Sequence, residues 1–169
     1  MVIWFIGLSG SGKTTLGIKL TEELRKKYDN VVFLDGDILR DVWGDDIDHS
    51  IKGREKNAKR ISNLCKVLDK QGLFVVASVL SIFPDWQRWN RENFSEYFEI
   101  FLDVPIKVLL ERDTKDLYKK AKKGELKNVV GLDIPFPKPY KPDLILSDWP
   151  SDESPDETLL KILKNISHI

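Results

Sequence analysis

The segment Gly7-Leu8-Ser9-Gly10-Ser11-Gly12-Lys13-Thr14 decides the fold of this chain of 169 residues. Its letters, GLSGSGKT, agree at every fixed position with G-x-x-x-x-G-K-[ST], the pattern of a phosphate-binding loop, or P-loop. The apolar run Val2–Ile6 precedes it, and the amphipathic segment Thr14–Lys27 follows it. A strand before the loop and a helix after it form the context in which this short motif becomes specific.

A loop of this kind predicts that the chain binds a nucleoside triphosphate. Glycines let the backbone curve so that its N–H groups, together with the N-terminus of the next helix, face the phosphates. Lys13 is expected to reach the β- and γ-phosphates, and the Thr14 hydroxyl to hold Mg²⁺. The alternative is a glycine-rich turn without a ligand, which the flanking strand and helix make improbable. The expected ATP-binding residues here are Gly7, Ser9, Gly10, Ser11, Gly12, Lys13, Thr14 and Thr15.

Short apolar runs alternate with amphipathic segments along the rest of the chain. Runs that are almost continuously apolar are typical of buried parallel strands, so the alternation predicts a three-layer α/β fold with a central parallel sheet. The length indicates one domain, residues 1–169. The expected strands are Val2–Ile6, Val31–Leu34, Leu73–Val79, Phe98–Leu102 and Leu144–Leu146, and the expected helices include Thr14–Lys27, Arg54–Gln71, Ile106–Arg112 and Asp156–Ile169, with an extended proline-rich segment at Asp133–Asp143.

Composition narrows the class of protein. The 27 basic and 27 acidic residues balance, so nothing indicates a partner that is a nucleic acid or a membrane surface. The apolar start of the chain is too short to span a bilayer and lacks the features of a signal peptide. The single cysteine, Cys65, lies in a helical pattern and is expected to be a core residue in a reducing compartment, so we expect a cytoplasmic protein.

Two acidic residues follow the second expected strand, in the stretch LDGDILR, Leu34–Arg40. Open α/β sheets bind ligands at the carboxyl ends of their strands, so Asp35 and Asp37 are expected to face the P-loop. Carboxylates there can hold Mg²⁺, whose charge offsets theirs, and can orient or deprotonate an attacking hydroxyl. The alternative for Asp37 is that it caps a helix beginning near Ile38.

Basic residues are concentrated in two further places. In GREKNAKR, Gly53–Arg60, the side chains of Arg54 and Asn57 share a helix face and can meet one ligand, unless this is merely a solvated outer face. Residues 112–127 carry a net charge of +4, which indicates either a solvated helix or a basic lid over bound phosphates. Trp86 and Trp89 are expected to pack in the core or at the surface rather than line an acceptor pocket.

Two classes of function are compatible with a P-loop. A regulatory nucleotide-binding module needs no acceptor, but the chain is short and lacks the N-K-x-D signature of guanine-specific switches. A small kinase needs an acceptor site, a carboxylate to orient the acceptor hydroxyl, and a lid. The sequence has a candidate for each of these three requirements.

The segments FLDGDILR, GREKNAKR, RDTKDLYKKAKKGE and GLDIPFPKPYKPDL, following the P-loop in this order, resemble adenylylsulfate kinases. These enzymes phosphorylate the 3′-hydroxyl of adenosine 5′-phosphosulfate (APS) with ATP and Mg²⁺. The resemblance extends from Ile3 to Leu146 and implies a P-loop kinase fold with a basic lid at about residues 112–130. By analogy with the family, it also implies a possible homodimer.

The resemblance implies roles residue by residue. The implied catalytic residues are Asp35, Asp37 and Lys13. The implied ligands of Mg²⁺ are Thr14 and Asp35. Arg112 falls on the lid arginine that packs on the ATP base. The implied acceptor-binding positions are Asp37, Arg40, His49, Arg54, Asn57, Ser81, Lys115 and Val129.

The chain departs from the family pattern at the acceptor base. His49 and Val129 stand where adenylylsulfate kinases carry two phenylalanines that sandwich adenine, and each such stack is worth roughly 1–3 kcal/mol. In addition, Ile82 replaces the proline after Ser81, and Asp116 replaces the glycine after Lys115. We therefore expect the same reaction on a different acceptor, as in the cytidine diphosphoramidate kinase branch of the family, which acts on a cytidine 3′-hydroxyl in capsule phosphoramidate synthesis. Adenylylsulfate kinase activity remains the alternative.

Overall fold

A five-stranded parallel sheet forms the centre of the computed structural model, which describes residues 1–44, 46–113, 116–147 and 154–166. The strand order is β2-β3-β1-β4-β5. The strands are β1 (Val2–Ile6), β2 (Val31–Asp35), β3 (Phe74–Val79), β4 (Tyr97–Leu102) and β5 (Leu144–Leu146). Each lies within one residue of an apolar run predicted as a strand, and the predicted parallel α/β fold is confirmed.

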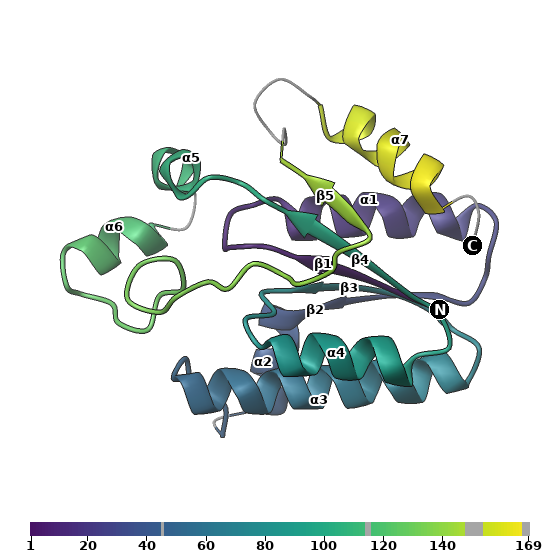
Figure 1. Ribbon diagram of the computed structural model, residues 1–169, viewed down its shortest axis with the longest axis horizontal. Helices are drawn as coiled ribbons and strands as arrows, with labels where there is room; N and C mark the ends of the chain where they lie inside the picture. The colour runs from purple at the N-terminus through teal and green to yellow at the C-terminus, as the bar shows by residue number, and fades with distance from the viewer. Residues whose placement is uncertain (45, 114–115, 148–153, 167–169) are drawn as a thin grey trace.

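Helices cover both faces of the sheet, which gives the three predicted layers (Figure 1). One face carries α1 (Lys13–Arg25) and α7 (Pro155–Ile166). The other carries α2 (Gly36–Trp43), α3 (Ile51–Lys70) and α4 (Pro84–Asn93). Two short helices, α5 (Ile106–Arg112) and α6 (Leu117–Lys122), lie beyond the carboxyl ends of the strands. No described helix is both long enough and apolar enough to cross a bilayer.

The central strand β1 is buried along its whole length because both faces of the sheet are covered. Side chains alternate between faces along a strand. Ile3 and Phe5 accordingly join the core under α1, whereas Trp4 and Ile6 join the core under α3, where Cys65 is fully buried as predicted. This two-sided burial explains why the strand appears in the sequence as an unbroken apolar run.

The register of the strands brings their carboxyl ends to one edge of the sheet. Ile6 pairs with Val79, and Asp35 pairs with Ser78. The P-loop after β1, the turn after β2 and the segment after β3 therefore leave the sheet side by side. This edge is where a ligand is expected in an open α/β sheet.

Gly17 determines how closely α1 approaches the sheet. A Cβ atom at this position would lie 2.6 Å from a ring carbon of Phe33 and 2.6 Å from Ser78 Oγ. The same Ser78 hydroxyl donates a 3.0 Å hydrogen bond to the Lys13 carbonyl in the first turn of α1. The close contact thus fixes the first turn of α1, and with it the P-loop, against β3.

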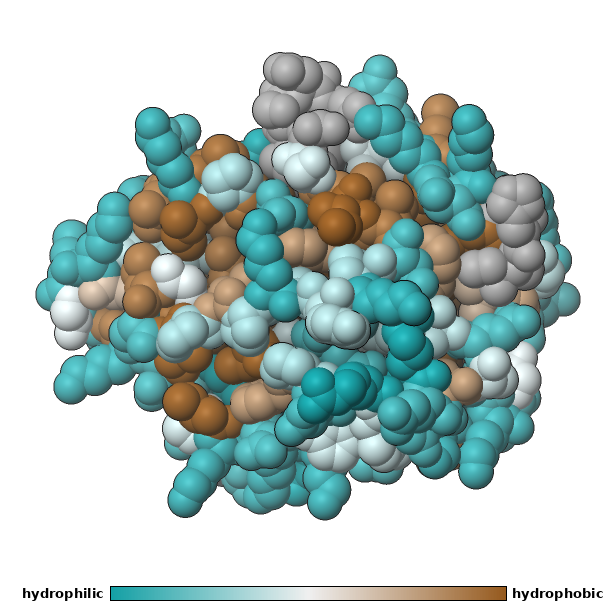
Figure 2. All heavy atoms as spheres, in the orientation of Figure 1, coloured by the Kyte–Doolittle hydropathy of each residue, from teal (hydrophilic) through white to brown (hydrophobic). Residues whose placement is uncertain are grey.

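The end of the molecule that carries α5 and α6 has a surface of mixed character (Figure 2). Figure 2 shows hydrophobic atoms gathered there between projecting hydrophilic side chains. From α6, Tyr118 joins the core under α1, while Leu117 and Ala121 pack against it. The basic segment is therefore anchored by apolar contacts on its inner side and exposes its lysines on the outer side.

Candidate active site

A cavity of about 560 Å³ opens at the carboxyl edge of the sheet. The structure brings together there most of the residues that the sequence predicts for the site, from segments far apart in the chain. They are Ser9, Gly10, Gly12, Lys13, Thr14, Thr15, Asp35, Asp37, Arg40, His49, Arg54, Asn57, Ser81, Arg112 and Val129. Among the other predicted residues, Gly7 and Ser11 are not in the cavity wall, and Lys115 lies outside the described residues.

Gly7 and Ser11 support the P-loop from below. Ser11 is fully buried, and a Cβ atom at Gly7 would lie 2.6 Å from its hydroxyl oxygen and 3.0 Å from the Leu102 carbonyl. Gly10 and Gly12 have φ angles of 79° and 95°, in the region that side chains disfavour. Gly7 and Ser11 thus support the loop from inside the fold, while Gly10 and Gly12 give it the curvature that turns it toward the cavity.

The loop presents positive charge to the cavity. Lys13 Nζ donates a 2.8 Å hydrogen bond to the Leu8 carbonyl, which holds the ammonium group at the loop. Gly12 directly precedes α1 and has no side chain to cap it, so the first N–H groups of the helix remain suited to an anion. The arrangement fits the phosphates of a nucleotide.

Asp35 links the P-loop to the second strand. Its Oδ2 accepts a 2.7 Å hydrogen bond from the Thr14 hydroxyl, while Oδ1 accepts 2.8 Å and 3.4 Å bonds from the N–H groups of Asp37 and Ile38. Asp35 is thus the N-cap of α2, which begins at Gly36. The alternative that Asp37 caps a helix beginning near Ile38 is wrong, because β2 extends to Asp35, whose extended backbone conformation suits the cap position.

The pair Thr14 and Asp35 fits Mg²⁺ chemically. Both side chains offer hard oxygen ligands, and these oxygens lie 2.7 Å apart at the cavity wall. Within the described parts of the chain there is no cluster of three or more His, Cys, Asp or Glu side chains that could enclose a cation. Such a cluster is not required, because Mg²⁺ at nucleotide sites is held by one or two protein oxygens together with phosphates and water.

Positive charge also accumulates on the opposite wall. Arg40 Nη1 donates to the Asp48 carbonyl at 2.8 Å, and Arg54 donates from Nε to the His49 carbonyl at 3.0 Å and from Nη2 to the Asn128 carbonyl at 2.7 Å. Burial lowers the pKa of Arg40, and burial together with the neighbouring Arg40 charge lowers the pKa of Arg54. Burial, and then the two guanidinium groups, likewise lower the pKa of His49. Such a wall is suited to an anionic ligand.

The first turns of α3 are tied to α2 through Asn57. Its Nδ2 donates to the Gly36 carbonyl at 3.3 Å, and its Oδ1 accepts a 3.0 Å bond from Trp43 Nε1. Its amide therefore has structural partners even though the residue lines the cavity. Arg60, one turn further, is not in the cavity wall and instead binds the Asp46 carboxylate at 2.6 Å and 2.9 Å, as expected for a solvated face.

The segment after β3 forms a strained part of the wall. Ser81 has a φ angle of 56°, and its carbonyl accepts a 2.8 Å hydrogen bond from the buried Nε2 of Gln87. Phe83, two residues on, is the only Phe, Tyr or Trp among the described residues that line the cavity. Sequence reasoning missed Phe83 and Gln87, although Phe83 lies in the segment that leaves the carboxyl end of the third strand.

Two other predictions concern aromatic and buried residues. Trp86 and Trp89 do not line the cavity and pack edge to face, with ring centroids 5.4 Å apart. Val129 is 3% exposed, and the N–H groups of Asn128 and Val129 both donate to the Asp133 carboxylate. Val129 therefore contributes a firmly held aliphatic side chain to the cavity wall.

Comparison with known proteins finds kinases of one family. The family model described as adenylylsulphate kinase matches residues 1–147. A cytidine diphosphoramidate kinase of Campylobacter jejuni is 40% identical over 147 residues, which is 87% of this chain and 85% of that protein. A probable adenylyl-sulfate kinase of Pseudomonas aeruginosa is 33% identical over 99% of this chain and 77% of its own length. The solved APS kinase CysC of Mycobacterium tuberculosis, in complex with AMPPNP and APS, superposes with a TM-score of 0.88 at 31% identity, covering 98% of this chain and 96% of that one.

Proposed function

This chain belongs to the adenylylsulphate kinase family and is a nucleotide kinase with a hydroxyl acceptor, and from that premise we propose that it transfers the γ-phosphoryl group of ATP to the 3′-hydroxyl of cytidine diphosphoramidate. The observation that carries the choice of acceptor is the composition of the cavity wall. By resemblance to the family, His49 and Val129 stand at the two positions of the adenine clamp, and Phe83 is the only Phe, Tyr or Trp in the described wall. The 40% identical relative named for this acceptor supports the same choice.

On the donor side, the P-loop holds the triphosphate of ATP. Its N–H groups and Lys13 bind the β- and γ-phosphates, so that Lys13 exchanges the Leu8 carbonyl for phosphate oxygens. Thr14 and Asp35 would hold Mg²⁺, which when bound neutralises charge on the transferring phosphoryl group. Arg112 packs its planar guanidinium on the adenine of ATP.

On the acceptor side, Asp35 and Asp37 orient the attacking hydroxyl, and one of the two carboxylates takes its proton. Both line the cavity beside the P-loop, and the cap interaction fixes Asp35 at the end of β2. Because phosphoryl transfer needs little covalent help from the protein, placing the hydroxyl in line with the γ-phosphorus is the larger part of catalysis.

The acceptor nucleotide lies along the opposite wall. Arg40, Arg54 and Asn57 hold its ribose and charged groups, and Ser81 and Lys115 meet the 5′ tail. A pyrimidine needs less stacking area than a purine, so His49 and Val129 suffice where adenine requires two aromatic rings. Homodimerisation and a cytoplasmic location are further proposals that rest on the family.

Adenylylsulfate kinase activity is the second candidate. It is favoured by the 33% identical relative from Pseudomonas aeruginosa and by the likeness to a structure that contains APS. The two candidates share the donor site and differ only in the acceptor base and the 5′ group. The substitutions at residues 49 and 129 are therefore the features on which the choice depends.

The test is a coupled assay of ADP release with each acceptor in turn. We expect ATP consumption to depend on an added acceptor, and cytidine diphosphoramidate to give a higher kcat/KM than adenosine 5′-phosphosulfate. Acceptor-independent ATP hydrolysis alone would contradict a kinase. A higher kcat/KM with adenosine 5′-phosphosulfate would reject the proposed acceptor while leaving the kinase intact.

A further inference from the structure

A hydrogen bond joins the lid helix to the P-loop. The hydroxyl of Tyr118, in α6, donates to the backbone carbonyl of Ser9 at 2.9 Å, although the two residues are 109 positions apart in the chain. The Tyr118 side chain is 2% exposed. Burial raises the pKa of Tyr118 to about 12, with a further contribution from the charge of Asp113, so the hydroxyl remains a donor throughout the neutral range.

The accepting carbonyl belongs to the peptide unit whose N–H group is that of Gly10. This peptide lies within the loop, where Gly10 has a φ angle of 79° and lines the cavity. A hydrogen bond to the oxygen of a peptide fixes the orientation of its plane and polarises its N–H group, which strengthens that group as a donor on the other side. The Tyr118 hydroxyl is thus positioned to influence how Gly10 N–H meets a phosphate oxygen.

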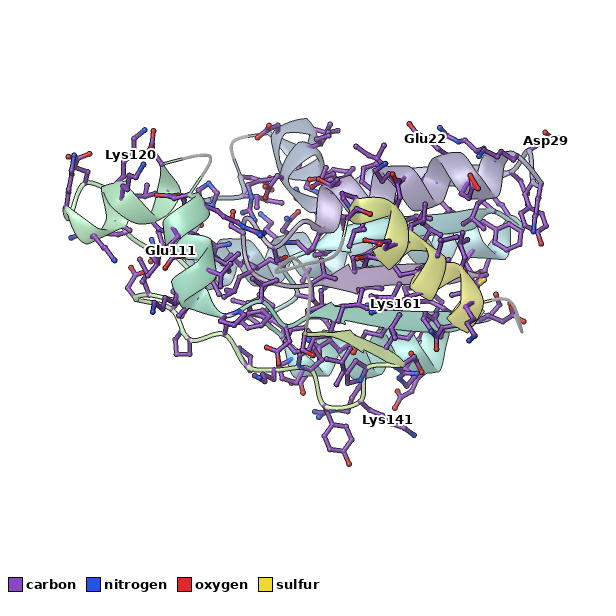
Figure 3. The ribbon with its side chains drawn as sticks, turned by 90° about the horizontal axis from the view of Figure 1, so that it is seen from above. Glu22, Asp29, Glu111, Lys120, Lys141 and Lys161 are labelled. Atoms are coloured by element: carbon purple, nitrogen blue, oxygen red, sulfur yellow. The ribbon has the colours of Figure 1, made fainter. Side chains whose placement is uncertain are left out.

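The rest of α6 is held so that this hydroxyl is well placed. The Asp113 carboxylate accepts hydrogen bonds from the N–H groups of Tyr118 and Lys119, at 3.1 Å and 2.7 Å. Leu117, the first residue of the helix, lines the cavity beside the P-loop. The outer side of α6 carries exposed lysines, and Figure 3 shows Lys120 pointing away from the sheet.

We infer that Tyr118 is a positioning residue that orients the Ser9–Gly10 peptide for the phosphates of the donor nucleotide and couples the lid helix to the occupied P-loop. This inference rests on the proposed use of ATP as donor. It assigns a function to the Tyr118 hydroxyl, since packing requires only the aromatic ring and the charge of the lid comes from its lysines. A tyrosine that only filled space could be replaced by phenylalanine without any effect on the nucleotide.

The test compares Tyr118→Phe with wild type in binding AMPPNP with Mg²⁺, measured by titration calorimetry. Phenylalanine keeps the ring and removes the hydroxyl. The bond between Tyr118 and Ser9 is also present without nucleotide, so only its strengthening when Gly10 N–H donates to a phosphate oxygen changes affinity, and we expect the dissociation constant to rise about 3- to 10-fold. In steady-state assays, the KM for ATP should rise by a similar factor, while the KM for the acceptor changes less.

Tyr97→Phe is the matched control. Tyr97 is a partly buried tyrosine whose hydroxyl donates to Glu99 at 2.6 Å, at the start of β4 and so at the opposite end of the sheet from the P-loop. Both variants lose one partly buried hydrogen bond, so both should melt at a lower temperature. Only Tyr118→Phe should bind the nucleotide more weakly, and equal nucleotide affinity in Tyr118→Phe and wild type would overturn the inference.

Limited trypsin digestion supplies a readout independent of the acceptor. Cleavage after the exposed lysines of α6 should be slowed by AMPPNP with Mg²⁺ in wild type and much less in Tyr118→Phe. Asp113→Ala, which loosens α6 but keeps the hydroxyl, should give an intermediate result. If Asp113→Ala weakened nucleotide binding and Tyr118→Phe did not, anchoring of the helix rather than the hydroxyl would be responsible.

If wild type itself failed to bind AMPPNP with Mg²⁺, the proposed donor, and this inference with it, would be rejected.

Discussion

Replacement of Asp35 separates its structural contribution from its chemical one. Its Oδ1 caps α2 and its Oδ2 accepts the Thr14 hydroxyl at 2.7 Å. Asp35→Ala removes both interactions. Loss of an N-cap costs about 0.5–2 kcal/mol, and loss of a hydrogen bond to a charged group about 1.5–3 kcal/mol, so we expect Asp35→Ala to lower the free energy of unfolding by about 2–5 kcal/mol.

Asp35→Asn and Asp35→Ser keep a side chain that can cap α2 but remove the carboxylate. Their free energy of unfolding should therefore fall by less than that of Asp35→Ala. If the carboxylate orients and deprotonates the acceptor hydroxyl, turnover in all three variants should nevertheless fall about 10²- to 10⁴-fold, which corresponds to about 2.7–5.4 kcal/mol of activation free energy. The affinity for ATP should change far less.

Urea unfolding gives the stability of each variant, and the coupled ADP-release assay gives kcat and the KM for each substrate. Turnover that followed stability, with Asp35→Asn and Asp35→Ser close to wild type, would refute a chemical role. Asp35 would then be only the cap of α2 and the partner of Thr14.

Three further predictions concern the helix contact, the acceptor wall and its charge. Gly17→Ala should lower the free energy of unfolding by about 1–3 kcal/mol in urea, because the added Cβ meets Phe33 and Ser78 at 2.6 Å; wild-type stability would show that α1 can shift freely. The double variant His49→Phe and Val129→Phe should raise kcat/KM for adenosine 5′-phosphosulfate relative to the cytidine acceptor by about 10-fold or more. An unchanged ratio of the two kcat/KM values would show that these positions do not select the acceptor base. Burial, and then the two guanidinium groups, keep the pKa of His49 below its usual value, so the imidazole is less protonated than a free histidine at the same pH. An anionic acceptor offsets the guanidinium charges and raises this pKa, so binding should take up protons in the pH range where His49 titrates, seen as a buffer-dependent enthalpy in calorimetry. No buffer dependence in wild type, or the same dependence in His49→Gln, would contradict this.

The sheet could be predicted closely because its three central strands are almost fully buried, and because the edge strands β2 and β5 are also apolar runs. Val2–Ile6 and Leu144–Leu146 agree at both ends with the apolar runs, and β2 is one residue longer because Asp35, a polar residue, still pairs with Ser78. The carboxyl-end rule also indicated correctly that Asp35 and the P-loop meet. These features depend on local pattern and on the general topology of parallel sheets.

The details of the wall could not be predicted in the same way. Trp43 and Asn57 are joined by a hydrogen bond between two helices, and Tyr118 reaches Ser9 across 109 positions. No periodicity or spacing encodes such contacts, because they depend on how the helices pack on the sheet. The short helix α2 carries exposed apolar residues and polar ones together, so its exact start at Gly36 also required the observed cap by Asp35.

The measurement that tests the account most directly is the ratio of kcat/KM for cytidine diphosphoramidate to that for adenosine 5′-phosphosulfate, with the phosphorylated position of each product located by nuclear magnetic resonance. The account predicts a ratio well above one and a phosphate on the 3′-hydroxyl of the cytidine product. A ratio below one, or phosphorylation at another position, would contradict it.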